Sequence, residues 1–156
     1  MDNKQHVCPS CGETMRWKSC EITTVVGKYK VRDNSGPAWC CECGESLVSM
    51  EALSGYEKRA ARTVLIDVQQ VEGNVLKFAR KAMSLTQAQL ATLLGVASET
   101  VSRWENNKDT ITRSTQLAVA TLLDLSCREG DDGIQAMLSA EPETNGPESL
   151  RVKVAS

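Results

Sequence analysis

Six of the seven cysteines lie before residue 44, and two short segments repeat one cysteine motif. Residues 8–12 (Cys-Pro-Ser-Cys-Gly) and residues 40–44 (Cys-Cys-Glu-Cys-Gly) both contain Cys-x-x-Cys-Gly. Two residues between thiolates let both sulfurs bind one metal ion from a tight turn, and the glycine lets the backbone bend toward them. Two such motifs together form the tetrahedral four-thiolate site that is usual for structural zinc. The expected ligands of one structural Zn²⁺ are Cys8, Cys11, Cys40 and Cys43.

The other cysteines fit this site less well. Cys41 competes with Cys40, but only the 40/43 register reproduces both the two-residue gap and the trailing glycine. Cys20 and Cys127 lack a partner at ligand spacing, so we expect small buried apolar side chains there. A redox enzyme built on Cys-x-x-Cys is the rival interpretation, but one motif would suffice for it and no βαβ pattern surrounds either motif. Four thiolates leave no open position on the metal, so we expect no enzymatic activity.

A second pattern covers residues 86–105 and is typical of a helix-turn-helix. Thr86 is suited to cap a first helix, and small Ala91 lies where two helices would cross closely. Gly95 falls at the turn, where a left-handed backbone is easiest without a β-carbon. An apolar stripe would join the two helices, made of Leu90, Leu94, Val101 and Trp104.

The exposed side of the second helix would be polar, and in a docked helix-turn-helix its N-terminal positions meet base edges in the major groove. The expected base contacts are Ser98, Glu99, Ser102 and Arg103. Groups at helix starts and in the following loop suit phosphate oxygens better. The expected phosphate contacts are Thr86, Gln87, Thr100 and Lys108. The alternatives are an ordinary helical hairpin with a solvated polar face, and an Arg103 that only pairs with Glu99.

The cysteine motifs and the helix-turn-helix need different supporting elements. We therefore expect a mainly α protein made of four segments. Residues 1–48 form a small four-cysteine zinc module, with two short strands expected in the β-branched run 22–31. Residues 49–73 form a helical connector capped by Ser49. Residues 74–128 are expected to form a five-helix helix-turn-helix domain for DNA binding and dimerisation, and residues 129–156 an acidic, disordered tail.

Charge is uneven along the chain, whose formal net charge is −2. Between residues 74 and 113, six basic residues face three acidic ones, so a DNA-binding surface fits an otherwise acidic protein. The sequence has neither a signal-peptide pattern nor a membrane-span pattern, which favours a cytoplasmic location. The apolar helix expected from Ser114 to Leu125 has more apolar surface than a small domain needs, which indicates a homodimer on a palindromic operator.

Residues 75–125 resemble the Xre/Cro repressor family through Ser-Leu-Thr-Gln-Ala-Gln-Leu-Ala at 84–91 and Val-Ser-Arg-Trp-Glu at 101–105. With the two cysteine motifs in front, residues 7–127 resemble the MqsA-type (YgiT-like zinc finger) antitoxins of bacterial toxin–antitoxin pairs. The resemblance implies that the zinc module binds a ribonuclease toxin while the C-terminal domain dimerises and represses its own operon. It also implies that Arg103 reads bases. Glu99 stands where the family has asparagine, and a glutamate there favours the amino group of cytosine.

The sequence therefore predicts a bacterial DNA-binding repressor that acts as an antitoxin. The alternative is a stand-alone Xre-family regulator, whose zinc module binds another protein or senses metal or redox state. The two differ only in the partner of the zinc module.

Overall fold

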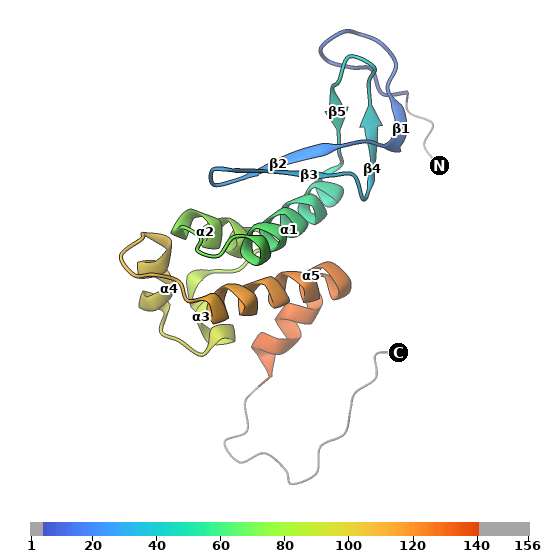
Figure 1. Cartoon of the computed structure of the whole chain (residues 1–156). Helices are drawn as coiled ribbons and strands as arrows, with labels where there is room; N and C mark the ends of the chain where they lie inside the picture. Colours follow the sequence, from blue (N-terminus) through green and yellow to red (C-terminus); the bar gives the residue numbers. More distant parts are fainter. Residues whose placement is uncertain (1–4, 141–156) are drawn as a thin grey trace.

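The structure, a computed structural model, describes residues 5–140. Over this range the chain forms short antiparallel strands followed by helices, so the predicted mainly α class with a small N-terminal β module is confirmed (Figure 1). The strands are β1 (Arg16–Ser19), β2 (Ile22–Val26), β3 (Tyr29–Asp33), β4 (Pro37–Cys40) and β5 (Ser46–Leu47). The helices are α1 (Met50–Asp67), α2 (Gly73–Ala82), α3 (Gln87–Leu94), α4 (Ser98–Glu105) and α5 (Arg113–Ser139).

The strands make two separate antiparallel sheets. Strands β1, β4 and β5 pair in that spatial order, with Trp17 opposite Trp39. Strands β2 and β3 form the hairpin expected from the β-branched run, and Gly27 turns it with a φ of +60°. The three-stranded sheet carries the cysteine motifs, whereas the hairpin extends away from them.

Most of the hairpin packs on helices, although Ile22 at its start clusters with Cys40 of the second cysteine motif. Val26 is fully buried within the helical core, and Lys28 Nζ lies 2.8 Å from a carboxylate oxygen of Glu72, just before α2. Near the other end of the hairpin, Arg59 Nε on α1 donates to Asp33 at 2.6 Å. Figure 1 shows the hairpin lying along α1 toward α2. Part of the predicted zinc module therefore shares the core of the helical domain.

Helix α1 forms as the sequence predicts, with Ser49 accepting a hydrogen bond from the amide of Ala52 at its start. It packs along α5 (Figure 1). A side chain from that helix binds its C-terminal carbonyls. Arg113 donates to the carbonyls of Leu65 and Val68 at 2.9 and 3.0 Å, and also to that of Ile66. These contacts satisfy orphan carbonyls at the helix end and fix α1 against the start of α5.

Helices α3 and α4 form the helix-turn-helix. Thr86 caps α3 through its side chain and forms a capping box with Gln89. At the turn, Gly95 has a φ of +69°, and the amide of Val96 donates to the carbonyl of Ala91 at 3.0 Å, as in a Schellman motif. The structure thus bears out both the cap and the glycine turn.

The start of α2 lies directly against the end of α4. A β-carbon on Gly73 would lie 2.1 Å from the backbone carbonyl oxygen of Trp104, so only glycine fits there. The Gly73 amide donates to the side-chain oxygen of Asn107 at 2.7 Å. This contact fixes the position of α4 from behind.

The acidic tail was expected to begin at residue 129, but the chain is helical through Ser139. Gly130, with a φ of +69°, introduces a kink inside α5. Ile134 beyond the kink is fully buried, which explains why the helix resumes. The remainder of the expected tail, 141–156, lies outside the described residues.

Candidate metal centre and DNA-binding face

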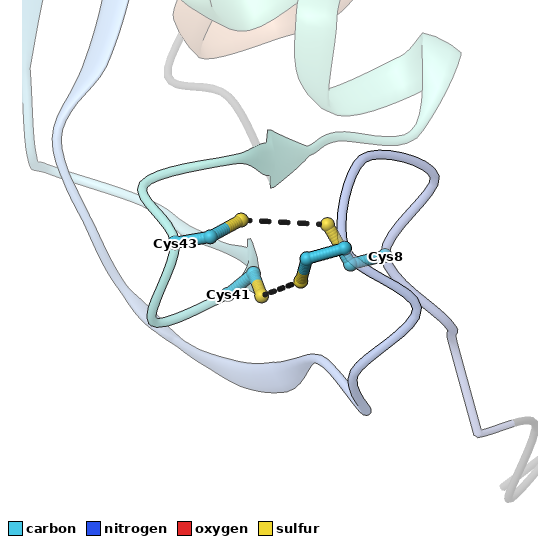
Figure 2. A group of neighbouring side chains, drawn as sticks. Cys8, Cys41 and Cys43 are labelled. Atoms are coloured by element: carbon cyan, nitrogen blue, oxygen red, sulfur yellow. Dashed lines mark hydrogen bonds between the residues drawn. The ribbon is translucent and has the colours of Figure 1, made fainter.

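Four thiols from the two cysteine motifs converge at the end of the three-stranded sheet. The sulfurs of Cys8, Cys11, Cys41 and Cys43 all lie within 4.8 Å of one another. Cys8 Sγ lies 3.6 Å from Cys43 Sγ, and Cys11 Sγ lies 3.4 Å from Cys41 Sγ (Figure 2). A tetrahedral zinc with bonds of about 2.3 Å separates its sulfurs by about 3.8 Å. The donor set and its dimensions therefore fit a four-coordinate metal ion with thiolate ligands.

One expected ligand was wrong, because Cys40 lies outside this cluster. Cys40 forms a disulfide with Cys20, and Cys41 contributes the fourth sulfur. Cys40 is the last residue of β4 and faces the buried side together with Ala38. Since successive side chains on a strand point to opposite faces, the next residue is the one that faces the thiol cluster. Cys20, expected to be a small buried apolar side chain, is instead the partner that holds Cys40.

The two cysteine turns differ by one residue in their backbone hydrogen bonds. In the first, the amide of Cys8 donates to the carbonyl of Glu13, and the amide of Gly12 donates to the carbonyl of Cys8. In the second, the amide of Cys41 donates to the carbonyl of Glu45, and the amide of Gly44 donates to the carbonyl of Cys41. Each bond of the second turn therefore closes a ring one residue shorter than its counterpart in the first.

The thiols of the cluster differ in how readily they ionise without a metal. Burial opposes ionisation of Cys8, but the backbone amides of Cys11 and Ser10 outweigh it and lower the pKa of Cys8 to about 7. At Cys11 the backbone amide of Glu13 favours the thiolate. The thiols around Cys11, that of Cys41 first among them, oppose ionisation and raise the pKa of Cys11 to about 12. Thiolates crowded in this way need a cation to neutralise them, which is what a bound Zn²⁺ would do.

The four residues expected to contact bases lie on α4 with Val101 and Trp104 buried behind them. Ser98, Glu99 and Arg103 are exposed, and Ser102 is half-buried. Arg103 pairs with Asp109 in the following loop, with Nε at 2.5 Å and Nη2 at 3.1 Å from the two carboxylate oxygens. The arginine is therefore oriented by a carboxylate other than Glu99, the partner considered from the sequence.

The residues expected to contact phosphate are less uniform. Thr86 is exposed and serves as a helix cap, Thr100 is half-buried, and Lys108 is exposed in the loop after α4. The side-chain amide of Gln87 donates to Glu105 at 2.8 Å. Because this hydrogen bond occupies the Gln87 side chain, the backbone amides at the start of α3 are better placed than the side chain to contact a phosphate.

A buried ion pair lies behind this face, and no sequence motif indicates it. Arg80 contacts both carboxylate oxygens of Glu105, at 2.6 and 3.1 Å, and also donates to the carbonyl of Leu85 at 2.8 Å. Burial raises the pKa of the Glu105 carboxyl, but Arg80 and Gln87 outweigh it and hold that pKa below its usual value. This network joins α2, α3 and α4. Arg80 is one of the six basic residues between 74 and 113, but its charge is paired inside the domain, where it stabilises the fold.

Helices α3 and α4, with a glycine turn between them and a polar exposed face on the second, define the helix-turn-helix class of DNA-binding domain. Residues 76–129 match the helix-turn-helix family and form a domain of the Xre/Cro type. The curated proteins contain no match to this chain. Among the described helices, none is long and apolar enough to cross a membrane.

Proposed function

We propose that the chain is a sequence-specific transcriptional repressor that binds DNA through α4. The observation that carries this proposal is the exposed polar face of α4, on which Asp109 orients Arg103 in the last turn of the helix. A planar guanidinium bonds the O6 and N7 of guanine together, which is the commonest specific contact in the major groove. Glu99, one turn before Arg103, supplies an acceptor for the amino group of cytosine.

Lys108, Thr86 and Thr100 are proposed to contact phosphates on either side of the groove. Lys108 is exposed beside the end of α4, and Thr86 and Thr100 lie near the starts of α3 and α4. Backbone amides at helix N-termini are natural phosphate donors, so Gln87 is assigned to phosphate through its backbone. These contacts set the register of the domain, while α4 reads the sequence.

The repressor is proposed to act as a homodimer on a palindromic operator. Leu117 on α5 is 43% exposed and borders a shallow groove with Ile66 of α1 and Thr121. Among the apolar residues of this helix, Val119, Leu122 and Leu123 are buried inside the domain. The surface around Leu117 is therefore the part of the expected dimer face that remains available to a second subunit.

The zinc module is proposed to bind a ribonuclease toxin and keep it inactive, which would make the protein the antitoxin of a pair that represses its own operon. Trp17 is 51% exposed and lies 5.3 Å, centroid to centroid, from Trp39. Exposed aromatic side chains that pack together in this way mark protein interaction surfaces. Zn²⁺ is proposed to be structural, the protein to have no enzymatic activity, and its location to be the bacterial cytoplasm.

DNA recognition can be tested with the full chain and DNA from upstream of its own gene. Binding isotherms would compare wild type, Arg103→Ala and Arg128→Ala on that DNA and on a scrambled duplex. Arg128 is a matched control, since it is also an exposed arginine paired with an aspartate, here Asp124 of α5. We expect only Arg103→Ala to lose discrimination. Equal affinity of wild type for both duplexes would contradict sequence-specific repression.

The partner of the zinc module needs a separate experiment. Co-expression with the product of a neighbouring small basic reading frame should give a complex that survives purification. Trp17→Ala should weaken that complex and leave DNA binding unchanged. If no neighbouring product binds, the alternative of a stand-alone regulator is favoured, and the Cys20–Cys40 disulfide is the observation that supports a sensing role for it.

A further inference from the structure

Two adjacent cysteines, Cys40 and Cys41, are placed so that only one at a time can complete the metal site. Cys40 is buried and bonded to Cys20, whereas Cys41 lies 3.4 Å from Cys11 in the thiol cluster. Neighbouring side chains at the end of a strand face opposite ways, so the backbone cannot present both sulfurs to one ion. Because its sulfur is bonded to Cys20, Cys40 is not available as a metal ligand.

The backbone of the second turn indicates that Cys40 is the better fitted of the two. In the first turn, the ring closed from Cys8 to Glu13 spans five residues along the chain, whereas the ring from Cys41 to Glu45 spans four. If Cys40 took the place of Cys41, its amide would face the carbonyl of Glu45 across five residues, as in the first turn. A slip of one residue would therefore make the two turns alike, with Gly12 and Gly44 at equivalent positions.

We infer that Cys40 and Cys41 are alternative ligands of one metal site, exchanged by reduction and formation of the Cys20–Cys40 disulfide. In the oxidised protein the ligands are Cys8, Cys11, Cys41 and Cys43, as the structure places them. In the reduced protein, Cys40 replaces Cys41 and restores the Cys-x-x-Cys-Gly register in both turns. The inference does not depend on DNA binding.

The exchange balances with a dithiol as the reductant. The dithiol gives two electrons and two protons to the Cys20–Cys40 bond, which becomes two thiols, while the dithiol becomes a disulfide. Cys40 then gives up its proton as it binds the metal, and Cys41 takes up a proton as it leaves. The charge of the ligand set is unchanged, so the site remains a closed four-thiolate site in both states.

The exchange has a structural cost at the end of β4, the central strand of the three-stranded sheet. Cys40 pairs with Ser46, and Trp39 pairs with Leu47, where β4 meets β5. A slip of one residue in the turn breaks these pairs and the pair of Cys40 with Arg16, and leaves the other β1–β4 pairs, from Trp17 to Ser19, in place.

The first test is differential alkylation of the full-length, zinc-loaded wild type, followed by mass spectrometry of its peptides. One sample is oxidised with glutathione disulfide; the other is reduced with dithiothreitol, desalted without oxygen and supplied with one equivalent of Zn²⁺. We expect Cys41 to react at least about tenfold faster with iodoacetamide in the reduced sample, while Cys40 stays protected. Exposed Cys127 is the internal reference in both samples. A protected Cys41 with a reactive Cys40 after reduction, or no Cys20–Cys40 peptide after oxidation, would overturn the inference.

The second test measures zinc content in variants. Cys41→Ser should keep its zinc when reduced and lose it when oxidised, because the disulfide then sequesters the replacement ligand. The double variant with Cys20→Ser and Cys41→Ser should keep zinc in both conditions, because Cys40 can no longer be sequestered. Loss of zinc from reduced Cys41→Ser, or its retention after oxidation, contradicts an exchange. Cys127→Ser, with a cysteine far from the site changed, should behave as wild type.

Discussion

Asp109 holds Arg103 by two hydrogen bonds across the turn that follows α4. Both side chains are nearly half exposed, so the pair lies at the surface where DNA would dock. A guanidinium held from one side keeps its other donors free, and its orientation is set before DNA arrives. This preorganisation reduces the rotamer entropy lost on binding.

The pair predicts two distinguishable effects on DNA recognition. Arg103→Ala should weaken binding to the specific site by about 5- to 150-fold and remove the preference at one base pair in each half-site. Asp109→Asn should keep affinity for unrelated DNA but reduce the preference at that same base pair, since the guanidinium is no longer fixed. Isotherms on a panel of single-base variants of the site measure both effects. An unchanged preference in both variants would contradict the assignment of Arg103 as the reading residue.

Lys108 predicts a different pattern, because a phosphate contact carries no sequence information. Lys108→Ala should weaken binding to all duplexes by a similar factor. The slope of log affinity against log salt should fall in magnitude by about one. Lys30→Ala in β3 is a matched control, an exposed lysine on the far hairpin, and should leave the slope unchanged. A selective loss on one sequence would move Lys108 from phosphate contact to base contact.

The buried pair of Arg80 and Glu105 predicts how stability depends on pH. The pKa of Glu105 lies below its usual value in the folded protein, so its contribution is fully present above that usual value. The contribution disappears as the pH falls from about 5 through the lowered pKa. Glu105→Gln should cost about 3 kcal/mol at neutral pH, because Arg80 is left buried without its partner. Urea unfolding between neutral and acid pH should then show a shallower acid dependence for the variant than for wild type.

Because α2 and α4 approach each other closely at Gly73, adding one methyl group there should lower the stability of the domain. Gly73→Ala would place its β-carbon against the backbone of Trp104 and Glu105, which cannot move as a flexible side chain would. We expect a loss of about 1–3 kcal/mol and weaker DNA binding as α4 is displaced. Gly55→Ala on α1 is the control, because its β-carbon meets only the end of the Arg59 side chain. Thermal unfolding of both variants decides the matter, and equal stability would contradict the packing described.

Metal removal should affect the N-terminal module first. We expect about one zinc per chain, and Cys11→Ser should lose it, because folding of such small modules is coupled to metal binding. Elemental analysis with circular dichroism measures both, and Cys127→Ser is the control. Freshly purified reduced protein without zinc would contradict the metal assignment.

Much of the helical part follows from local sequence alone. Ser49 caps α1, Gly95 ends α3, and α3 and α4 together cover the helix-turn-helix expected at residues 86–105. These features are predictable because caps, glycine and apolar periodicity act over a few neighbours. The Cys40 assignment failed because motif spacing does not say where β4 ends or which face its last residue takes. The partners of Arg103 and Arg80 were missed for a related reason. Asp109 and Glu105 come into reach only after a turn and a helix crossing are set in three dimensions.

The burial of Val26 determines which parts of the protein unfold together. Its side chain is sealed among the helices, although its strand belongs to the cysteine-rich half of the sequence. Amides of β2 and β3 should therefore exchange with deuterium at the pace of α1 and α2, whereas those around Cys8 and Cys43 exchange earlier. The early-opening unit then consists of two segments, the residues before about residue 20 and those of β4 and β5, with the hairpin between them belonging to the helical unit. The single boundary at residue 48 expected from the sequence is replaced by this interleaved division.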